Sequence, residues 1–208
     1  MAKLRGVLIA LNGLALVVLV VSALWVMNER WAVSAAVRLP NLRFDLMEDH
    51  VTVRLDGQEI QSIPFDPAAL TRENRAYFIA TPDINFDGYP DLTLIRSQGL
   101  QNIYYDGWLW VPAEQRFVRD PAIEGLSSPV FDEKDKRIRT YEHGSATDHV
   151  SAEYAYLDGT LTEIWRQEQS YDVERNLFTL RTYRLKDGRL MLTDEERLTP
   201  EQLEARDD

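Results

Sequence analysis

The chain contains no cysteine. This absence excludes disulfide bonds, thiolate metal sites and thiol nucleophiles, and it also excludes the lipid-modified cysteine of a lipoprotein. The fold must therefore be stabilised by packing, with a bound metal as a further means. A chain without cysteine is compatible with any redox compartment, so the count does not locate the protein.

Positive charge is scarce in this sequence. Lys and Arg together number 23 against 34 Asp and Glu, which gives a formal net charge of -11. Such a chain repels phosphate backbones at long range, so we expect no nucleic acid partner. Cations and basic proteins are the partners that this charge favours.

Catalytic motifs are also missing. The sequence has no G-x-S-x-G elbow, no H-E-x-x-H pair and no phosphate-cradling glycine loop. Acidic residues are plentiful, yet no pair is singled out by its surroundings for glycoside hydrolysis. We therefore expect that the protein is not an enzyme.

One long hydrophobic run is present, from Gly6 to Met27, and Lys3 and Arg5 precede it. At about 1.5 Å per helical residue the run spans roughly 30 Å, which matches the hydrocarbon core of a bilayer. Because positive charge marks the cytoplasmic side, the rest of the chain should lie across the membrane. The sequence predicts a single-pass protein of the cell inner membrane with its C-terminal domain in the periplasm.

A cleaved signal peptide is the alternative for this segment. Val21-Ser22-Ala23 and Val33-Ser34-Ala35 both place small residues as a signal peptidase requires. The apolar run is long for a signal peptide, which favours the anchor. Either interpretation exports the domain.

The sequence after the hydrophobic run favours strands. Val51 to Leu55 alternates with a period of two, Asp56-Gly57 supplies a turn, and Ile60 to Phe65 returns as a second strand. We expect four parts in the chain: a transmembrane signal anchor over residues 1–30, a connector over 31–50, a β domain over 51–198 and a charged tail over 199–208.

Further strands are expected along the β domain. They cover Ala76 to Ala80, Leu92 to Ile95, a hairpin of Gly107 to Val111 with Arg116 to Arg119, and a meander from Ile138 to Arg197. Asp-Gly pairs supply two of the turns in the meander. The fold class predicted is all-β, an antiparallel meander of about ten strands.

The segment from residue 83 to residue 91 reads D-I-N-F-D-G-Y-P-D and carries oxygen ligands at alternate positions. Calcium takes six to eight oxygen ligands, and a short loop with carboxylates at positions one, three and five supplies them. Asp83, Asn85, Asp87 and Asp91, with the carbonyl of Tyr89, are the predicted ligands. The cofactor expected is Ca²⁺, in a structural role.

An Asp-rich turn that satisfies its own backbone groups and binds nothing is the competing interpretation. Against it, three carboxylates within nine residues repel one another without a cation, and no Lys or Arg lies inside the loop. Leu94 stands where an EF-hand requires a bidentate Glu, so the loop belongs between strands.

The stretch Asp83 to Leu94 resembles the Asp-rich loop of integrin-type FG-GAP propeller repeats. Together with Trp108-Leu-Trp-Val-Pro and Gln115-Arg-Phe-Val, it is more closely similar to a family of bacterial envelope proteins built as an incomplete β-propeller. One branch of that family consists of immunity proteins that inhibit lysozyme-like peptidoglycan hydrolases. The resemblance covers roughly Tyr77 to Arg197, and it implies a propeller-like fold and a basic hydrolase as partner.

Two weaker signals complete the sequence. His143 and His149 lie in a polar segment in which no regular spacing places the two imidazoles on one face, so we expect a polar loop there. Tyr104, Tyr105, Trp108 and Trp110 form either a sugar-stacking platform or ordinary cross-strand packing; packing is the favoured interpretation, because Trp108 and Trp110 share one face of a strand.

The function expected from these features is that of a calcium-binding, membrane-anchored periplasmic module that binds a protein partner. The resemblance implies a lysozyme-like peptidoglycan hydrolase as that partner and inhibition as the outcome. A glycan-binding or peptidoglycan-binding envelope protein that uses an aromatic surface is the alternative.

Overall fold

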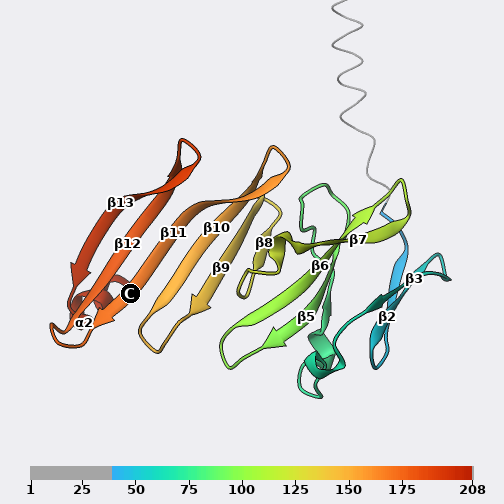
Figure 1. Ribbon diagram of the computed structural model, residues 1–208, viewed down its shortest axis with the longest axis horizontal. Helices are drawn as coiled ribbons and strands as arrows, with labels where there is room; N and C mark the ends of the chain where they lie inside the picture. Colours follow the sequence, from blue (N-terminus) through green and yellow to red (C-terminus); the bar gives the residue numbers. More distant parts are fainter. Residues whose placement is uncertain (1–38, 208) are drawn as a thin grey trace, which may run out of the picture. The chain divides into compact units, whose positions relative to one another are not determined.

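The computed structural model describes residues 39–207 (Figure 1). This part of the chain forms thirteen strands, three short 3-10 helices and one α-helix. The strands make three antiparallel sheets, so the all-β prediction is confirmed at this level. The predicted signal anchor over residues 1–30 and its alternative lie outside the described residues; within residues 39–207, no helix has the length and apolar character needed to cross a membrane.

The first sheet contains one strand that the sequence analysis missed. Its strands are β1 (Leu42–Leu46), β2 (His50–Leu55) and β3 (Gln58–Pro64), in that order. The hairpin of β2 and β3 confirms the prediction, but β1 falls inside the predicted connector over residues 31–50. β1 pairs with β2 because Leu42, Phe44 and Leu46 alternate with polar residues and pack against the core.

The second sheet has the order β4 (Ile79–Ala80), β5 (Leu92–Gln98), β6 (Ile103–Val111), β7 (Arg116–Asp120). The predicted strand from Ala76 to Ala80 is mostly wrong, since residues Arg75–Tyr77 form the 3-10 helix η2. Buried Asn74 explains the difference. Its side chain accepts from the backbone N–H of Thr71 and donates to the carbonyl of Ala69, which holds this segment in turns.

The first two sheets share one hydrophobic core. Its buried members come from β2 and β3 and from the second sheet with the adjoining Phe78: Val51, Val53, Ile63, Phe78, Leu92, Leu94, Ile95, Trp108, Trp110 and Phe117. The amide of Gln61 joins the two sheets, because it donates to the carbonyl of Phe117 at 2.9 Å and accepts from the N–H of the same residue at 2.8 Å.

The third sheet is the predicted meander. Its strands are β8 (Val130–Asp132), β9 (Arg137–His143), β10 (His149–Leu157), β11 (Thr160–Asp172), β12 (Leu177–Lys186) and β13 (Arg189–Leu198). Asp158-Gly159 and Asp187-Gly188 occupy two of its turns, each pair with positive φ at both residues. The turn chemistry that predicted these bends is therefore confirmed.

A second core joins the third sheet to the loop before β5. Ile84 from that loop, Ile138 from β9, and Ile123 and Leu126 from the connection between β7 and β8 form its buried part. Ile123 ends the 3-10 helix η3 (Pro121–Ile123), which Asp120 caps through the N–H of Ala122 at 2.9 Å. Another 3-10 helix, η1 (Pro67–Ala69), is capped by Asp66 in the same way.

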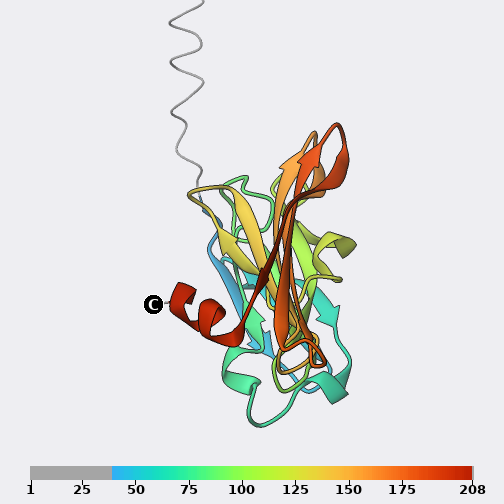
Figure 2. The same ribbon diagram turned by 90° about the vertical axis from the view of Figure 1, so that its left-hand side faces the viewer.

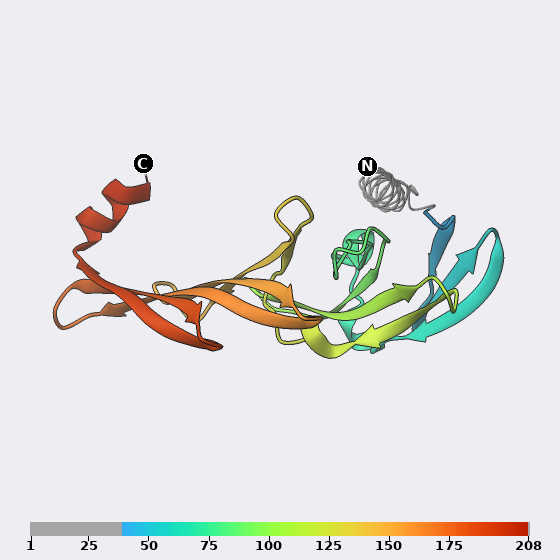
Figure 3. The same ribbon diagram turned by 90° about the horizontal axis from the view of Figure 1, so that it is seen from above.

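Polar contacts stabilise the outer strands of the third sheet. Of the residues in β11, β12 and β13, only Leu180 is buried. Polar side chains link neighbouring strands instead: Arg181 pairs with Glu195 at 2.9 Å, and the amide of Gln167 donates to the hydroxyl of Thr182 at 3.3 Å. The charged tail forms helix α2 (Pro200–Asp207), which projects from one face of the sheet (Figure 2, Figure 3).

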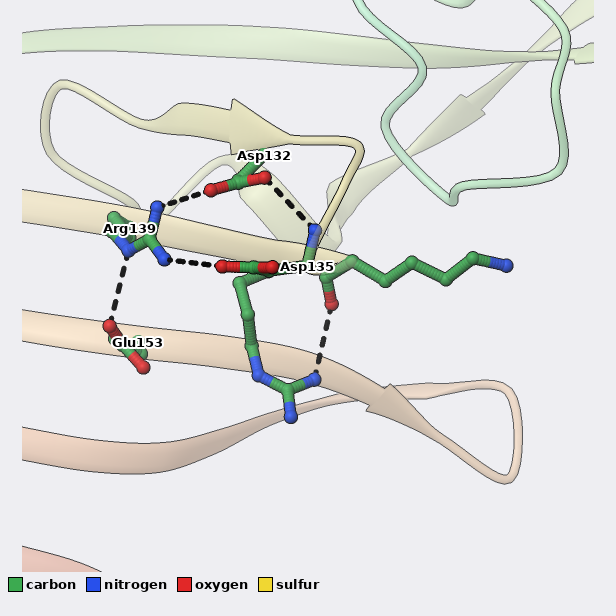
Figure 4. Close-up of polar contacts among 6 residues, drawn as sticks. Asp132, Asp135, Arg139 and Glu153 are labelled. Carbon is green, nitrogen blue, oxygen red and sulfur yellow. Dashed lines mark hydrogen bonds and ion pairs between the residues drawn. The ribbon is translucent and has the colours of Figure 1, made fainter.

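Arg139 on β9 organises the inner end of this sheet. Its guanidinium reaches Asp132 on β8 at 2.5 Å, Asp135 in the following turn at 3.4 Å and Glu153 on β10 at 3.1 Å (Figure 4). The carboxylates of Asp132 and Glu153 raise the pKa of Arg139. One cation thus ties the turn and both strands together.

Gly107 on β6 allows the close approach of η3. A Cβ atom at this position would lie 2.8 Å from two side-chain carbons of Ile123. We expect Gly107→Ala to lower the free energy of unfolding by about 1–3 kcal/mol, because overpacking forces neighbouring atoms to move. Urea unfolding measures the loss. Gly125→Ala is the matched control, since no atom lies within 4 Å of its Cβ; equal losses in both variants would contradict the packing argument.

Candidate metal-binding loop and other candidate sites

The loop between β4 and β5 brings three of the predicted ligands together. The N–H of Asp87 donates to Asp83 Oδ1 at 3.0 Å and to Asn85 Oδ1 at 3.2 Å, so these two oxygens lie close to each other. Asn85 Nδ2 in turn donates to Asp87 Oδ2 at 3.1 Å. The N–H of Gly88 binds Asp83 Oδ2 at 2.8 Å. Three oxygen-bearing side chains therefore converge at one end of the loop.

Apolar residues at the intervening positions fix the loop to the protein. Ile84 is fully buried, and Phe86 packs edge-on against Tyr156 of β10 with ring centroids 6.5 Å apart. Phe86 has a φ of 60° and Gly88 a φ of 90°, so the backbone turns sharply at both residues. The spacing of the oxygen ligands in the sequence did not indicate that Ile84 and Phe86 anchor the loop.

Asp91 faces inward and is fully buried. Its Oδ2 accepts from the N–H of Ile84 and its Oδ1 from the N–H of Trp110 on β6, both at 2.8 Å. This carboxylate therefore links the two ends of the loop to the second sheet. A cation bound by Asp91 would have to share oxygens that already accept backbone hydrogen bonds.

The donor set suits a hard cation on one side of the loop. Within residues 39–207, no three carboxylate or imidazole groups are arranged to hold a metal ion. The loop offers two carboxylates, Asp83 and Asp87, with the amide of Asn85, and oxygen ligands of this kind are those that calcium prefers. The carbonyl of Tyr89 and the inward Asp91 complete the predicted set. Calcium binding at this loop stays a prediction.

The two histidines lie together, contrary to the expected polar loop. His143 ends β9 and His149 begins β10, and the two residues are direct partners across the strands, with ring centroids 5.8 Å apart. His149 Nε2 lies 2.7 Å from the amide nitrogen of Gln169, which also donates to the carbonyl of Thr147 at 3.0 Å. Only the pairing of the strands, which the sequence did not reveal, brings the imidazoles to one face.

Packing accounts for two of the four aromatic candidates. Trp108 and Trp110 are 6% and 4% exposed and belong to the first core, which confirms the packing interpretation for both. Tyr105 packs against both cores. Tyr104 remains accessible, and its hydroxyl donates to Glu142 at 3.3 Å.

A groove of about 450 Å³ lies on the third sheet. No motif in the sequence predicts a site there. The lining of the groove comes from β11, β12, β13 and α2: Trp165, Gln167, Thr182, Arg184, Thr193, Asp194, Glu196 and Arg206. These residues spread over more than forty positions of sequence. Strand register alone brings them together, so no local motif could have indicated the groove.

The fold of this chain resembles that of a solved structure. No protein family model and no curated protein matches the sequence. Among solved structures, the chain is similar to a type IV secretion system related protein of Xanthomonas, with a TM-score of 0.50 and 17% identity over 74% of this chain and 85% of that chain. At this identity the likeness shows a shared β-rich fold and nothing about activity.

Burial raises the pKa of Asp91 to about 7, although the N–H groups of Trp110 and Ile84 act in the opposite direction. The pKa of this carboxyl group is higher in the folded protein than in the unfolded chain. The group therefore makes its full contribution to stability at pH values below the pKa of the unfolded chain, and that contribution is lost as the pH rises toward 7. The Asp91→Asn variant has no such titration. With metal chelated, we therefore expect the free energy of unfolding of Asp91→Asn, measured relative to that of the natural protein, to increase as the pH rises from 4 to 7.

Chemical unfolding at several pH values measures this difference. Asp158→Asn in an exposed turn is the control, and its stability should run parallel to that of the natural protein. A relative loss of stability for Asp91→Asn across the same interval would show that the pKa is lowered instead.

Calcium is expected to raise the melting temperature. A ligand bound only by the native state adds about 2.7 kcal/mol at a hundredfold excess over its Kd. Asp87→Ala should abolish the rise because it removes a carboxylate that converges with Asp83 and Asn85. Asp158→Ala should keep it. An equal response to calcium in the natural protein and in Asp87→Ala would rule out this loop as the site.

Proposed function

We propose that the protein is a calcium-binding, membrane-anchored periplasmic module that binds a protein partner and catalyses no reaction. The observation that carries this proposal is the construction of the 83–91 loop. Asp83, Asn85 and Asp87 converge on its outer side, while Ile84, Phe86 and Asp91 fix its inner side to two cores. Such a loop suits a structural ion that holds an exposed surface in one conformation.

The arrangement of the strands supports an incomplete β-propeller for this chain. Three antiparallel sheets follow one another in chain order, each made of consecutive strands. The Asp-rich loop resembles that of FG-GAP repeats, and the fold likeness to a secretion-related protein of Xanthomonas agrees with an envelope setting. We propose that the N-terminal segment anchors the chain in the cell inner membrane.

The partner proposed is a basic, lysozyme-like peptidoglycan hydrolase, which the module inhibits as an immunity protein does. This partner follows from the family resemblance, and the net charge of -11 supports it because opposite charge speeds association. Charge alone gives no specificity, so tight binding requires anchor side chains. Trp108 cannot serve, because it is buried, whereas Tyr104 is partly exposed.

A glycan-binding role is the second candidate. The groove on the third sheet favours it, because Trp165 lies there among hydroxyl, amide and charged groups. Glycan binding and hydrolase inhibition use different surfaces, and a single chain can carry both.

Inhibition is tested by mixing the purified exported part with lysozyme-like hydrolases that the same cell encodes or encounters. We expect slower clearing of a cell-wall suspension, with an effect that weakens as salt screens the charge. Tyr104→Ala should reduce inhibition without changing the melting temperature, because its side chain lies outside both cores.

A different result in the same assay would favour the second candidate function. If no hydrolase is slowed at any salt concentration while the protein sediments with the walls, glycan binding replaces inhibition as the function.

A further inference from the structure

The groove on the third sheet is formed by side chains that strand pairing places on one face. Trp165 of β11 is the direct partner of Arg184 on β12, and Thr182 of β12 is the partner of both Gln167 and Asp194. Partners across antiparallel strands project to the same side of a sheet. The floor of the groove is therefore set by the register of three strands.

A β-bulge in β13 adds a further polar group. Tyr183 pairs with Leu192 and Thr182 with Asp194, so Thr193 is an extra residue without a partner in the register. Bulges bend a strand and redirect its side chains. Here Thr193 and Asp194 both line the groove, and Thr193 Oγ1 donates to the carbonyl of Thr182 at 3.0 Å.

Helix α2 closes one end of the groove through an ion pair. Arg206 binds both carboxylate oxygens of Glu196, at 2.8 Å and 3.3 Å, so these two charges offset each other. The side chains of Arg184 and Asp194 are exposed, and neither side chain has an ion-pair or hydrogen-bond partner among residues 39–207. One group that can only donate and one group that can only accept therefore remain available to a ligand.

This lining selects the chemistry of a ligand. A cation would be repelled by Arg184 and an anion by Asp194. Hydroxyl groups both donate and accept, so they satisfy both residues. Trp165 contributes an indole to this mostly polar lining, and the volume lies in the range of about 300–1,000 Å³ that is usual for ligand sites.

We propose that the groove around Trp165 is a binding site for an uncharged saccharide. The ring lies on the indole, and its hydroxyl groups bind Arg184, Asp194 and Gln167. The site is separate from the calcium loop in its residues, and it requires neither the ion nor a hydrolase partner.

The test is calorimetric titration of the purified full chain with chitotetraose and with maltotetraose, with chelator present. We expect at least one of these uncharged oligosaccharides to bind. Arg184→Ala and Asp194→Ala should each weaken binding roughly tenfold. Both side chains are exposed, so neither variant should unfold the sheet, and Trp165→Ala should abolish binding.

Leu192→Ala is the matched control, because Leu192 is 51% exposed on the same strand and its partner Tyr183 projects to the opposite face from Arg184. This variant should bind as the natural protein does. Cationic glucosamine tetramers and anionic galacturonate tetramers test the selectivity, and both should bind more weakly than the uncharged oligosaccharide.

Three outcomes would overturn the site: no binding of either uncharged oligosaccharide at millimolar concentration, unchanged binding in all three groove variants, or equally tight binding of the charged oligosaccharides. The hydrolase assay on Trp165→Ala separates the two proposals. Retained inhibition with lost saccharide binding shows two surfaces, and saccharide binding without any inhibition leaves this site standing while the proposed inhibition fails.

Discussion

The buried carboxylate of Asp91 is the contact on which the central part of the fold depends. It accepts one backbone N–H from the start of the 83–91 loop and another from the C-terminal end of β6, so a single side chain closes the loop and ties it to a sheet. The N–H of Asp91 also donates to the carbonyl of Pro82 at 2.8 Å. A carboxylate without these donors would be costly in this position, and the donors would be equally costly without it.

The same contact determines how the loop joins the two cores. The closed loop directs Ile84 and Phe86 away from the first core and into the second, where they meet Ile123, Ile138 and Tyr156. The second core joins the third sheet to the second sheet and to the loop before it. Beyond β10, burial decreases sharply, and the outer strands are stabilised by their backbone ladder and by cross-strand polar contacts such as the ion pair of Arg181 with Glu195.

The decrease in burial leaves side chains of the outer strands accessible. A sheet that is covered on both faces has no side chains available to a ligand, whereas β11 to β13 leave polar and aromatic groups accessible on either side. The outer strands therefore carry the groove in which we propose that a saccharide binds. The loop at 83–91, by contrast, is fixed to two cores, which suits a structural ion and a surface of constant shape.

The sequence by itself determined the features that depend on local chemistry. Alternation and Asp-Gly turns defined the hairpins of the first and third sheets, and the spacing of Asp83, Asn85 and Asp87 defined the loop, because turn geometry and strand period are properties of neighbouring residues. Only the tertiary structure decided which side of the loop Asp91 faces, that His143 meets His149, and that Trp165 lies beside Arg184. Each of these depends on strand pairing or on packing between segments far apart in the chain, and a short sequence pattern carries no information about either.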